Sequence, residues 1–312
     1  MKPFFPEPKK IKTMKSIKDK QGSVIAVGNF DGFHLGHRKL VQTLETIARE
    51  RNLLSMILTF FPNPRVYFNK DLNLISSDEQ KKQLLEKLEV DRVLFLNFDE
   101  ILNMSGEAFV KDILIDRFHM KFIVMGENFR FGKDRECGVE SLKEMAEKFG
   151  FEWTVVPPVI LDGTMVSSSL IRKKLGQAQI RESNRLLGRM YYIDGVVIEG
   201  DKIGRELGFP TINIQTENEI LPEGVFKTGT EIDGKMYDSI TYIGTSPTLL
   251  SGKVKKVETH ILGFEKNIYG KEVRVYFEKR LRGEMTFDSQ TKLIDQIKKD
   301  IQRLKVDKGL FF

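Results

Sequence analysis

The chain has 312 residues, and at roughly 150 residues per domain this length predicts two domains. Its 40% hydrophobic and 30% charged residues exclude a disordered or low-complexity protein. The 50 basic and 44 acidic residues give a net charge of +6, which is compatible with nucleic acid but equally with phosphorylated small molecules.

No apolar run reaches the roughly 20 residues that span a bilayer, and no signal-peptide core follows the Lys-rich start. The single cysteine, Cys137, excludes an internal disulfide. Basic and acidic residues alternate in stretches such as 81–89, which indicates solvated helix faces rather than a nucleic-acid-binding block. We therefore expect a cytoplasmic protein that is neither secreted nor inserted in a membrane.

The first half of the chain alternates between short apolar runs and helical patterns. Strands are predicted at residues 24–27, 53–60, 92–98, 122–125 and 153–156. Helices are predicted at 38–52, after the capping box of Ser76 and Glu79, at 105–118 and at 139–149. This alternation predicts an α/β domain with a parallel sheet covered on both faces, whose ligands bind beyond the carboxyl ends of the strands.

The second half shows no helical pattern between Gly188 and a closing helix at 289–304. Strands are predicted at 225–232, 235–243, 258–264 and 272–277. Asp233-Gly234 between the first two is typical of a two-residue hairpin turn, because both positions need positive φ. We predict a small, mainly antiparallel sheet or barrel with a C-terminal helix, and we assign the two domains to residues 1–186 and 187–312.

The most informative segment is residues 28–37, GNFDGFHLGH, between the first strand and its helix. Backbone N–H groups at a helix N-terminus favour anions, and Gly32 and Gly36 let a ligand approach the main chain. His34 and His37 share one face of the first turn, where two imidazoles can stabilise the charge that develops as pyrophosphate leaves an α-phosphorus.

Two other interpretations of the histidines stay open. They could be packed structural residues, or two ligands of a zinc ion. Zinc normally needs three or four protein ligands, and the remaining soft donors, Cys137, His119 and His260, are not closely spaced.

The HxGH signature in this turn resembles the nucleotidylyltransferase superfamily, and residues 28–37 are similar to the adenylyltransferase module of bacterial bifunctional riboflavin kinase/FAD synthetases. The segments TFFPNP at 59–64, GENFRFG at 126–132 and SSSLIR at 167–172 agree in order and spacing. The resemblance implies a Rossmann-like domain in which His34 and His37 are catalytic. It also implies ATP contacts at Gly28, Phe30, Asp31, Gly36, Asn128, Ser167, Ser168 and Arg172, and flavin contacts at Phe60, Pro62 and Pro64. Taken alone, Asn128 could form a turn and Ser167 a helix N-cap.

Residues 200–213, GDKIGRELGFPTIN, form a second informative segment. Glycines four residues apart suit a loop whose N–H groups face phosphates, although a plain Gly-rich hairpin tip fits as well. Since GxxxxGK[ST] is absent from the sequence, a P-loop kinase is excluded. Thr211 and Asn213 put a hydroxyl and an amide oxygen on one side of an extended segment, and both are donors that suit Mg²⁺.

This segment resembles the Gly-rich and PTAN motif of riboflavin kinases, with further matches at residues 243–248, 258–260, 269–271 and 281–287. The resemblance implies Mg²⁺ at Thr211 and Asn213, and Glu284 as the general base for the terminal ribityl hydroxyl. By itself Glu284 is one more exposed acid. The implied ATP contacts are Gly200, Gly204, Arg205, Gly208 and Thr211. The sequence departs from the family pattern at Asn63, Ile212, Tyr242 and Gly263.

The resemblance extends from about residue 23 to residue 302. It implies a bifunctional enzyme that phosphorylates riboflavin to FMN and adenylylates FMN to FAD, with ATP as co-substrate and Mg²⁺ as cofactor. Two alternatives remain at this point. One is a nucleotidylyltransferase for another phosphorylated small molecule, and the other is a flavin- or RNA-binding regulator without catalysis.

Overall fold

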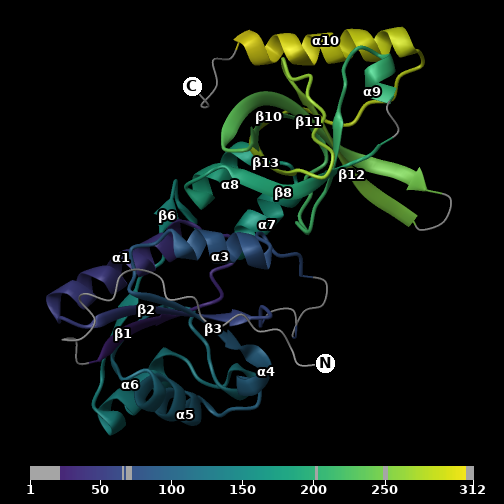
Figure 1. The fold of residues 1–312 in the computed structure, drawn as a ribbon. Coiled ribbons are helices and arrows are strands. Elements are labelled where there is room, and N and C mark those ends of the chain that lie inside the picture. The colour runs from purple at the N-terminus through teal and green to yellow at the C-terminus, as the bar shows by residue number, and fades with distance from the viewer. Residues whose placement is uncertain (1–21, 65–66, 68–71, 201–202, 249–251, 307–312) are drawn as a thin grey trace, which may run out of the picture. The chain divides into compact units, whose positions relative to one another are not determined.

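The computed structural model describes residues 22–64, 67, 72–200, 203–248 and 252–306. The chain divides into two compact units (Figure 1). The first unit contains residues 1–72 and 78–166, and the second contains 73–77 and 167–312. The functional boundary predicted at 186/187 stays a prediction.

The first unit is built on a five-stranded sheet of order β3-β2-β1-β4-β5, in which all pairs are parallel as predicted. Its strands are β1 (Ser23–Val27), β2 (Leu54–Phe61), β3 (Arg92–Asn97), β4 (Met120–Gly126) and β5 (Glu152–Val156). The chain order reverses at β1, which pairs with both β2 and β4. Parallel sheets bind ligands at such a switch point, just beyond the strand end, and here the segment of residues 28–37 follows β1.

Helices cover both faces of this sheet, α1 and α3 on one side and α5 and α6 on the other (Figure 1). Val24 of β1 belongs to the apolar core that contains Leu44 of α1, while Ile25 belongs to the opposite core with Leu114 and Leu142. This alternation is the period-two pattern of a strand buried on both faces. The helical elements are α1 (Leu35–Glu50), α3 (Asp78–Glu86), α4 (Phe98–Ile101), α5 (Gly106–Ala108), the π-helical η1 (Phe109–Arg117), the 3₁₀ turn η2 (Lys133–Arg135) and α6 (Val139–Phe149).

The second unit is a closed antiparallel barrel of order β10-β11-β12-β9-β8-β13, which confirms the predicted barrel. Its strands are β8 (Tyr191–Ile198), β9 (Ile212–Gln215), β10 (Gly224–Ile232), β11 (Lys235–Thr248), β12 (Gly252–Ile261) and β13 (Glu272–Arg282). The turn between β10 and β11 has φ of 51° at Asp233 and 74° at Gly234, as predicted. The sequence analysis missed β8. That strand contains Gly195, where a Cβ would lie 2.3 Å from the carbonyl oxygen of Gln215 on the paired strand.

Inside the barrel, buried hydroxyls bond to one another across the strands. Thr228 lies 2.8 Å from Ser239 and 2.9 Å from Thr241, and Thr241 lies 2.9 Å from Thr259. Each hydroxyl both donates and accepts, so this network satisfies polar groups that would otherwise be costly to bury.

Among the described residues, four helices accompany the barrel, and a short hairpin belongs to the first unit. The helices are α7 (Ser168–Gly176), α8 (Ile180–Leu187), α9 (Ile203–Glu206) and α10 (Gln290–Val306); the hairpin pairs β6 (Ile160–Leu161) with β7 (Thr164–Met165). Helix α9 was not predicted because four residues are too few to show a helical period. Helix α10 is fixed by a 2.8 Å ion pair between Asp300 and Arg282 of β13. In the part of the chain with described coordinates, no helix has the length and apolar character needed to cross a membrane.

Candidate active sites

The histidine pair lies at the start of α1. His34 is the N-cap residue, and its Nδ1 accepts a hydrogen bond from the backbone N–H of His37 at 3.4 Å. The two rings stack with centroids 3.7 Å apart and an interplanar angle of 15°. The structure therefore brings together the two imidazoles that the sequence predicts to share one face.

Gly36, Phe30 and Phe33 lie against the two imidazole rings and limit their positions. A Cβ at position 36 would lie 3.0 Å from Cε1 and 3.1 Å from Nδ1 of His34, so Gly36 leaves room for that ring. Phe30 packs edge-on against His37 at 5.2 Å, and Phe33 lies 6.2 Å away. Both phenylalanines are buried and have positive φ, 50° and 38°, which bulky residues seldom adopt. Such strain concentrates at functional loops.

A cavity of about 190 Å³, the sheet cavity, opens beside this loop and collects four residues predicted from the sequence: Gly28, Phe60, Pro64 and Asn128. Its lining also includes Phe98, Phe109, Phe129, Phe131, Arg130 and Arg135. Phe129 stacks on Phe131 at 5.3 Å. Aromatic walls with a few polar groups suit a flat ring system. Pro62, Asp31 and the two histidines are not part of this lining.

Lys81 of α3 is a candidate functional residue near the sheet cavity that the sequence analysis missed. Its side chain is only 4% exposed, and its Nζ donates a 2.8 Å hydrogen bond to the carbonyl oxygen of Phe60. Burial lowers the pKa of Lys81, and the charges of Asp78 and Asp31 partly offset that effect. The interpretation of residues 81–89 as a solvated face is wrong at this position. Alternating charge cannot reveal which side chains of a helix face the core, and we find no other sequence signal.

Ser167 is the N-cap residue of α7, the alternative to an ATP contact, and its Oγ accepts a 3.3 Å hydrogen bond from the N–H of Leu170. Ser168 and Arg172 follow in the same helix. All three residues belong to the second unit, and their predicted contacts with ATP stay predictions.

The second unit contains a pocket of about 400 Å³, the barrel pocket, which collects Gly204, Thr211 and Asn213. Its wall also includes Tyr242 and Glu258, with residues of α10 on one side. A Cβ at position 204 would lie 3.1 Å from Oγ1 of Thr211. Similarly, a Cβ at Gly200 would lie 1.9 Å from the amide nitrogen of Asn213. The glycine spacing therefore allows the loop to touch the two predicted metal ligands.

The oxygen donors of this pocket fit Mg²⁺. Thr211 and Asn213 line it together, and Glu258 of β12 is the cross-strand partner of Asn213 on β9. Mg²⁺ is usually held by one or two carboxylates together with waters and substrate phosphates, so a hydroxyl, an amide oxygen and one carboxylate are a suitable set. Of the other predicted residues, Gly208 has φ of 84° and Arg205 is exposed on α9.

Glu284 lies next to the barrel pocket, where Tyr242 holds it. The phenol of Tyr242 donates a 2.7 Å hydrogen bond to Oε1 of Glu284. Burial and the neighbouring Glu284 carboxylate raise the pKa of Tyr242, so the phenol keeps its proton at neutral pH. A Cβ at position 244 would lie 2.0 Å from the phenol oxygen, so only Gly244 permits this ring position. The departure from the family pattern at Tyr242 thus supplies a partner for the predicted base.

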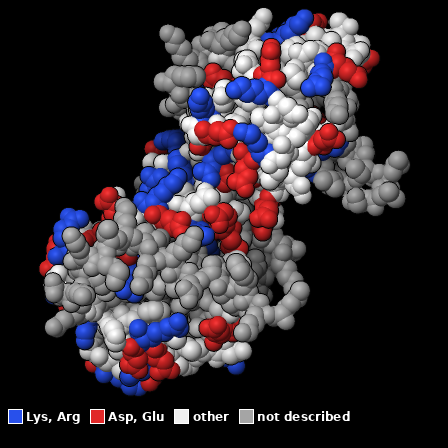
Figure 2. Space-filling view, in the orientation of Figure 1, with Lys and Arg blue, Asp and Glu red and all other residues white. Residues whose placement is uncertain are grey.

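Charge is spread over both units. Figure 2 shows Lys and Arg interspersed with Asp and Glu on the face in view.

Comparisons with known proteins match the two halves of the chain to two different descriptions. A model described as FAD synthetase matches residues 16–170, and a model described as riboflavin kinase matches residues 187–306. The bifunctional riboflavin kinase/FMN adenylyltransferase of Buchnera aphidicola subsp. Schizaphis graminum is 34% identical over 302 residues, covering 95% of this chain and 96% of that protein. The protein of the same description from Bacillus subtilis is 33% identical over 297 residues, covering 92% and 93%. A crystal structure from Streptococcus pneumoniae, described as a macrolide-efflux protein, aligns with a TM-score of 0.83 at 28% identity and covers 91% of this chain and 94% of its own.

Proposed function

This chain belongs to the family of bifunctional riboflavin kinases/FMN adenylyltransferases, and on that premise we propose which of its residues perform each reaction. The C-terminal module phosphorylates riboflavin to FMN, and the N-terminal module adenylylates FMN to FAD. The observation that carries our assignment of residues is the pair of separate sites, the stacked histidines beside the sheet cavity and Tyr242–Glu284 beside the barrel pocket.

In the N-terminal module, the flavin ring lies in the sheet cavity against Phe60 and Pro64, with Pro62 in the same turn. An oxygen of the FMN phosphate attacks the α-phosphorus of ATP, and the bond to pyrophosphate breaks. His34 and His37 donate hydrogen bonds to the phosphate oxygens and stabilise the negative charge that develops. Positioning and electrostatics are sufficient, so no covalent intermediate with the protein is needed. ATP is bound by Gly28, Phe30, Asp31, Gly36, Asn128, Ser167, Ser168 and Arg172.

In the C-terminal module, Glu284 takes the proton of the terminal ribityl hydroxyl as its oxygen attacks the γ-phosphorus of ATP and ADP leaves. Thr211 and Asn213 would hold Mg²⁺, and the bound ion would neutralise charge on the ATP phosphates. Gly200, Gly204, Gly208 and Arg205 shape the loop around those phosphates.

We assign the adenylyltransferase to residues 1–186 and the kinase to residues 187–312. The partners are the small molecules riboflavin, FMN and ATP, without nucleic acid or membrane. We place the protein in the cytoplasm.

One assay tests both assignments. The protein is incubated with riboflavin, ATP and Mg²⁺, and the flavins are separated by chromatography with fluorescence detection. We expect His37→Ala to accumulate FMN without FAD, and Glu284→Gln to leave riboflavin unchanged while still converting supplied FMN to FAD. In each variant the surviving activity is the control for folding. A single substitution that removes both activities from a folded protein would contradict the two-site assignment.

A further inference from the structure

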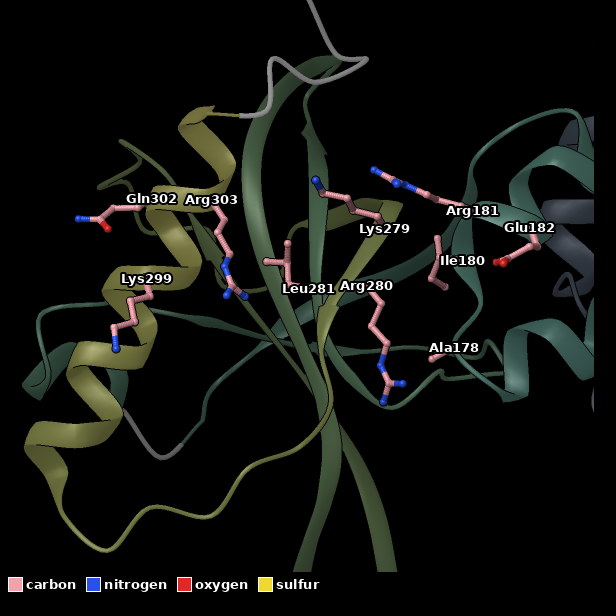
Figure 3. Close-up of a pocket in the computed structure, with 10 residues that line it drawn as sticks. All are labelled: Ala178, Ile180, Arg181, Glu182, Lys279, Arg280, Leu281, Lys299, Gln302 and Arg303. Carbon is pink, nitrogen blue, oxygen red and sulfur yellow. The ribbon is translucent and has the colours of Figure 1, made fainter.

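One hollow in the described part of the second unit belongs to neither proposed active site. It has a volume of about 780 Å³ and lies between α8, β13 and α10 (Figure 3). We call it the basic pocket. It is lined by Ala178, Ile180, Arg181, Glu182, Lys279, Arg280, Leu281, Lys299, Gln302 and Arg303. It shares no lining residue with the barrel pocket, although both are lined in part by α10: Lys299 and Arg303 belong to the basic pocket, whereas Ile297 and Ile301 belong to the barrel pocket.

The lining is strongly positive, with five Lys or Arg side chains and one carboxylate, Glu182. Figure 3 shows Arg181 of α8 and Lys279 of β13 reaching toward one another, and Arg303 of α10 directed toward Leu281. These cations come from three different elements, so the fold rather than a local run of sequence brings them together. Positive groups that converge in a concave site raise the local concentration of anions.

Neither Arg181 nor Arg303 forms an ion pair with any residue whose coordinates are described. Elsewhere in the barrel unit, by contrast, Lys227 pairs with Glu278 and Arg282 with Asp300. Burial lowers the pKa of Lys279, and the positive charges of Arg181 and Lys227 lower it further, against the opposing effect of Glu278. A bound anion would relieve this repulsion.

The lining also includes three apolar side chains. Ala178 and Ile180 are buried, and Leu281 lines the pocket with them. The volume falls within the roughly 300–1,000 Å³ of small-molecule sites. Cations together with apolar side chains match a ligand that joins linked phosphates to a flat ring.

We propose that the basic pocket binds a nucleotide with two or more linked phosphates, at a site separate from both active sites. Two molecules handled by this enzyme share that chemistry, the substrate ATP and the product FAD. The phosphates are held by Arg181, Lys279 and Arg303, and the ring lies against Ile180 and Leu281.

The test counts nucleotides on the full chain by equilibrium dialysis with radiolabelled ADP. Wild-type protein should bind one more ADP per chain than the double variant Arg181→Glu/Arg303→Glu, or bind that ADP at least tenfold more tightly. Both substituted side chains are exposed, so the fold should be retained, and both enzymatic activities serve as the check. The matched control is Lys292→Glu/Lys298→Glu, which changes the net charge of the chain by the same amount at two positions of α10 outside the pocket. This control should bind as much ADP as wild type.

Competition experiments then identify which nucleotide, ATP or FAD, is the ligand of the basic pocket. Unlabelled ATP and FAD are each titrated against the ADP that the Arg181→Glu/Arg303→Glu variant fails to bind, and the better competitor is the physiological ligand. Inorganic tripolyphosphate should compete at least tenfold more weakly, because it lacks a ring. Equal ADP binding by wild type and the double variant would overturn the proposal, and equal competition by tripolyphosphate would overturn the role of the apolar side chains. The difference between variants does not depend on which residues are catalytic, so failure here is distinguishable from failure of the proposed active sites.

Discussion

Tyr242→Phe removes one hydroxyl and leaves the ring in place, which makes it a sharp test of how Glu284 is positioned. The lost contact is the 2.7 Å hydrogen bond from the phenol to Oε1 of Glu284. Gly244 continues to accommodate the ring in the variant, since the space under the ring is unchanged. Without the phenol, the carboxylate is free to turn away from the substrate hydroxyl.

The expected effect is modest, because Glu284 is exposed to solvent. A hydrogen bond to a charged group contributes about 1.5–3 kcal/mol when it is buried. Water compensates much of that at an exposed site, which leaves about 1 kcal/mol. If this amount is lost only in the transition state, kcat for riboflavin phosphorylation falls roughly fivefold.

The assay is steady-state formation of FMN, with adenylylation of supplied FMN measured on the same preparation. We expect a lower kcat, an unchanged KM for ATP and unchanged adenylylation. The matched control is Tyr276→Phe, which removes a 2.8 Å hydrogen bond from another barrel phenol to Glu231, away from the barrel pocket. That variant should keep its full rate. Equal losses in the two variants, or no loss at Tyr242→Phe, would refute the positioning role.

Three further predictions concern buried contacts. Gly36→Ala adds a Cβ 3.0 Å from the ring of His34, and we expect adenylylation to fall about tenfold while riboflavin phosphorylation is unchanged, as measured by the same flavin chromatography. Lys81→Met removes the hydrogen bond that holds the Phe60 carbonyl, so KM for FMN should rise about tenfold without a change in riboflavin phosphorylation. Burial lowers the pKa of Lys81 in the folded chain below its ordinary value of 10.5. Between the folded pKa and the unfolded pKa, the unfolded chain binds more protons than the folded chain, so the free energy of unfolding rises with pH in that interval. Urea titrations of the Lys81→Met variant should lack this rise. Asp300→Ala leaves the part-buried Arg282 without its carboxylate partner, and we expect the free energy of unfolding to fall by about 3–5 kcal/mol. Amide hydrogen exchange along α10 should then be faster. Protection equal to that of wild type would show that this ion pair does not fix the helix.

The strand and helix patterns of the first half were sufficient to predict the parallel sheet, since apolar periodicity directly reflects which faces are covered. The antiparallel hairpin at Asp233-Gly234 could also be predicted from the sequence, because the type of turn depends on two adjacent residues. Strand β8 could not be predicted, because Asp194 and Gly195 interrupt the alternation of apolar and polar residues. Position 195 needs a glycine because the backbone of Gln215, on the paired strand 20 residues away, lies too close for a Cβ.

For the sites, local motifs were enough to indicate the stacked histidines and the Thr211–Asn213 pair, because their spacing of two or three residues fixes their relation within one element. The buried Lys81, the Tyr242–Glu284 contact and the basic pocket were decided only by the tertiary structure. Each depends on residues far apart in the chain, such as Tyr242 and Glu284, 42 positions apart, and a pattern along one strand or helix carries no information about which other element packs against it.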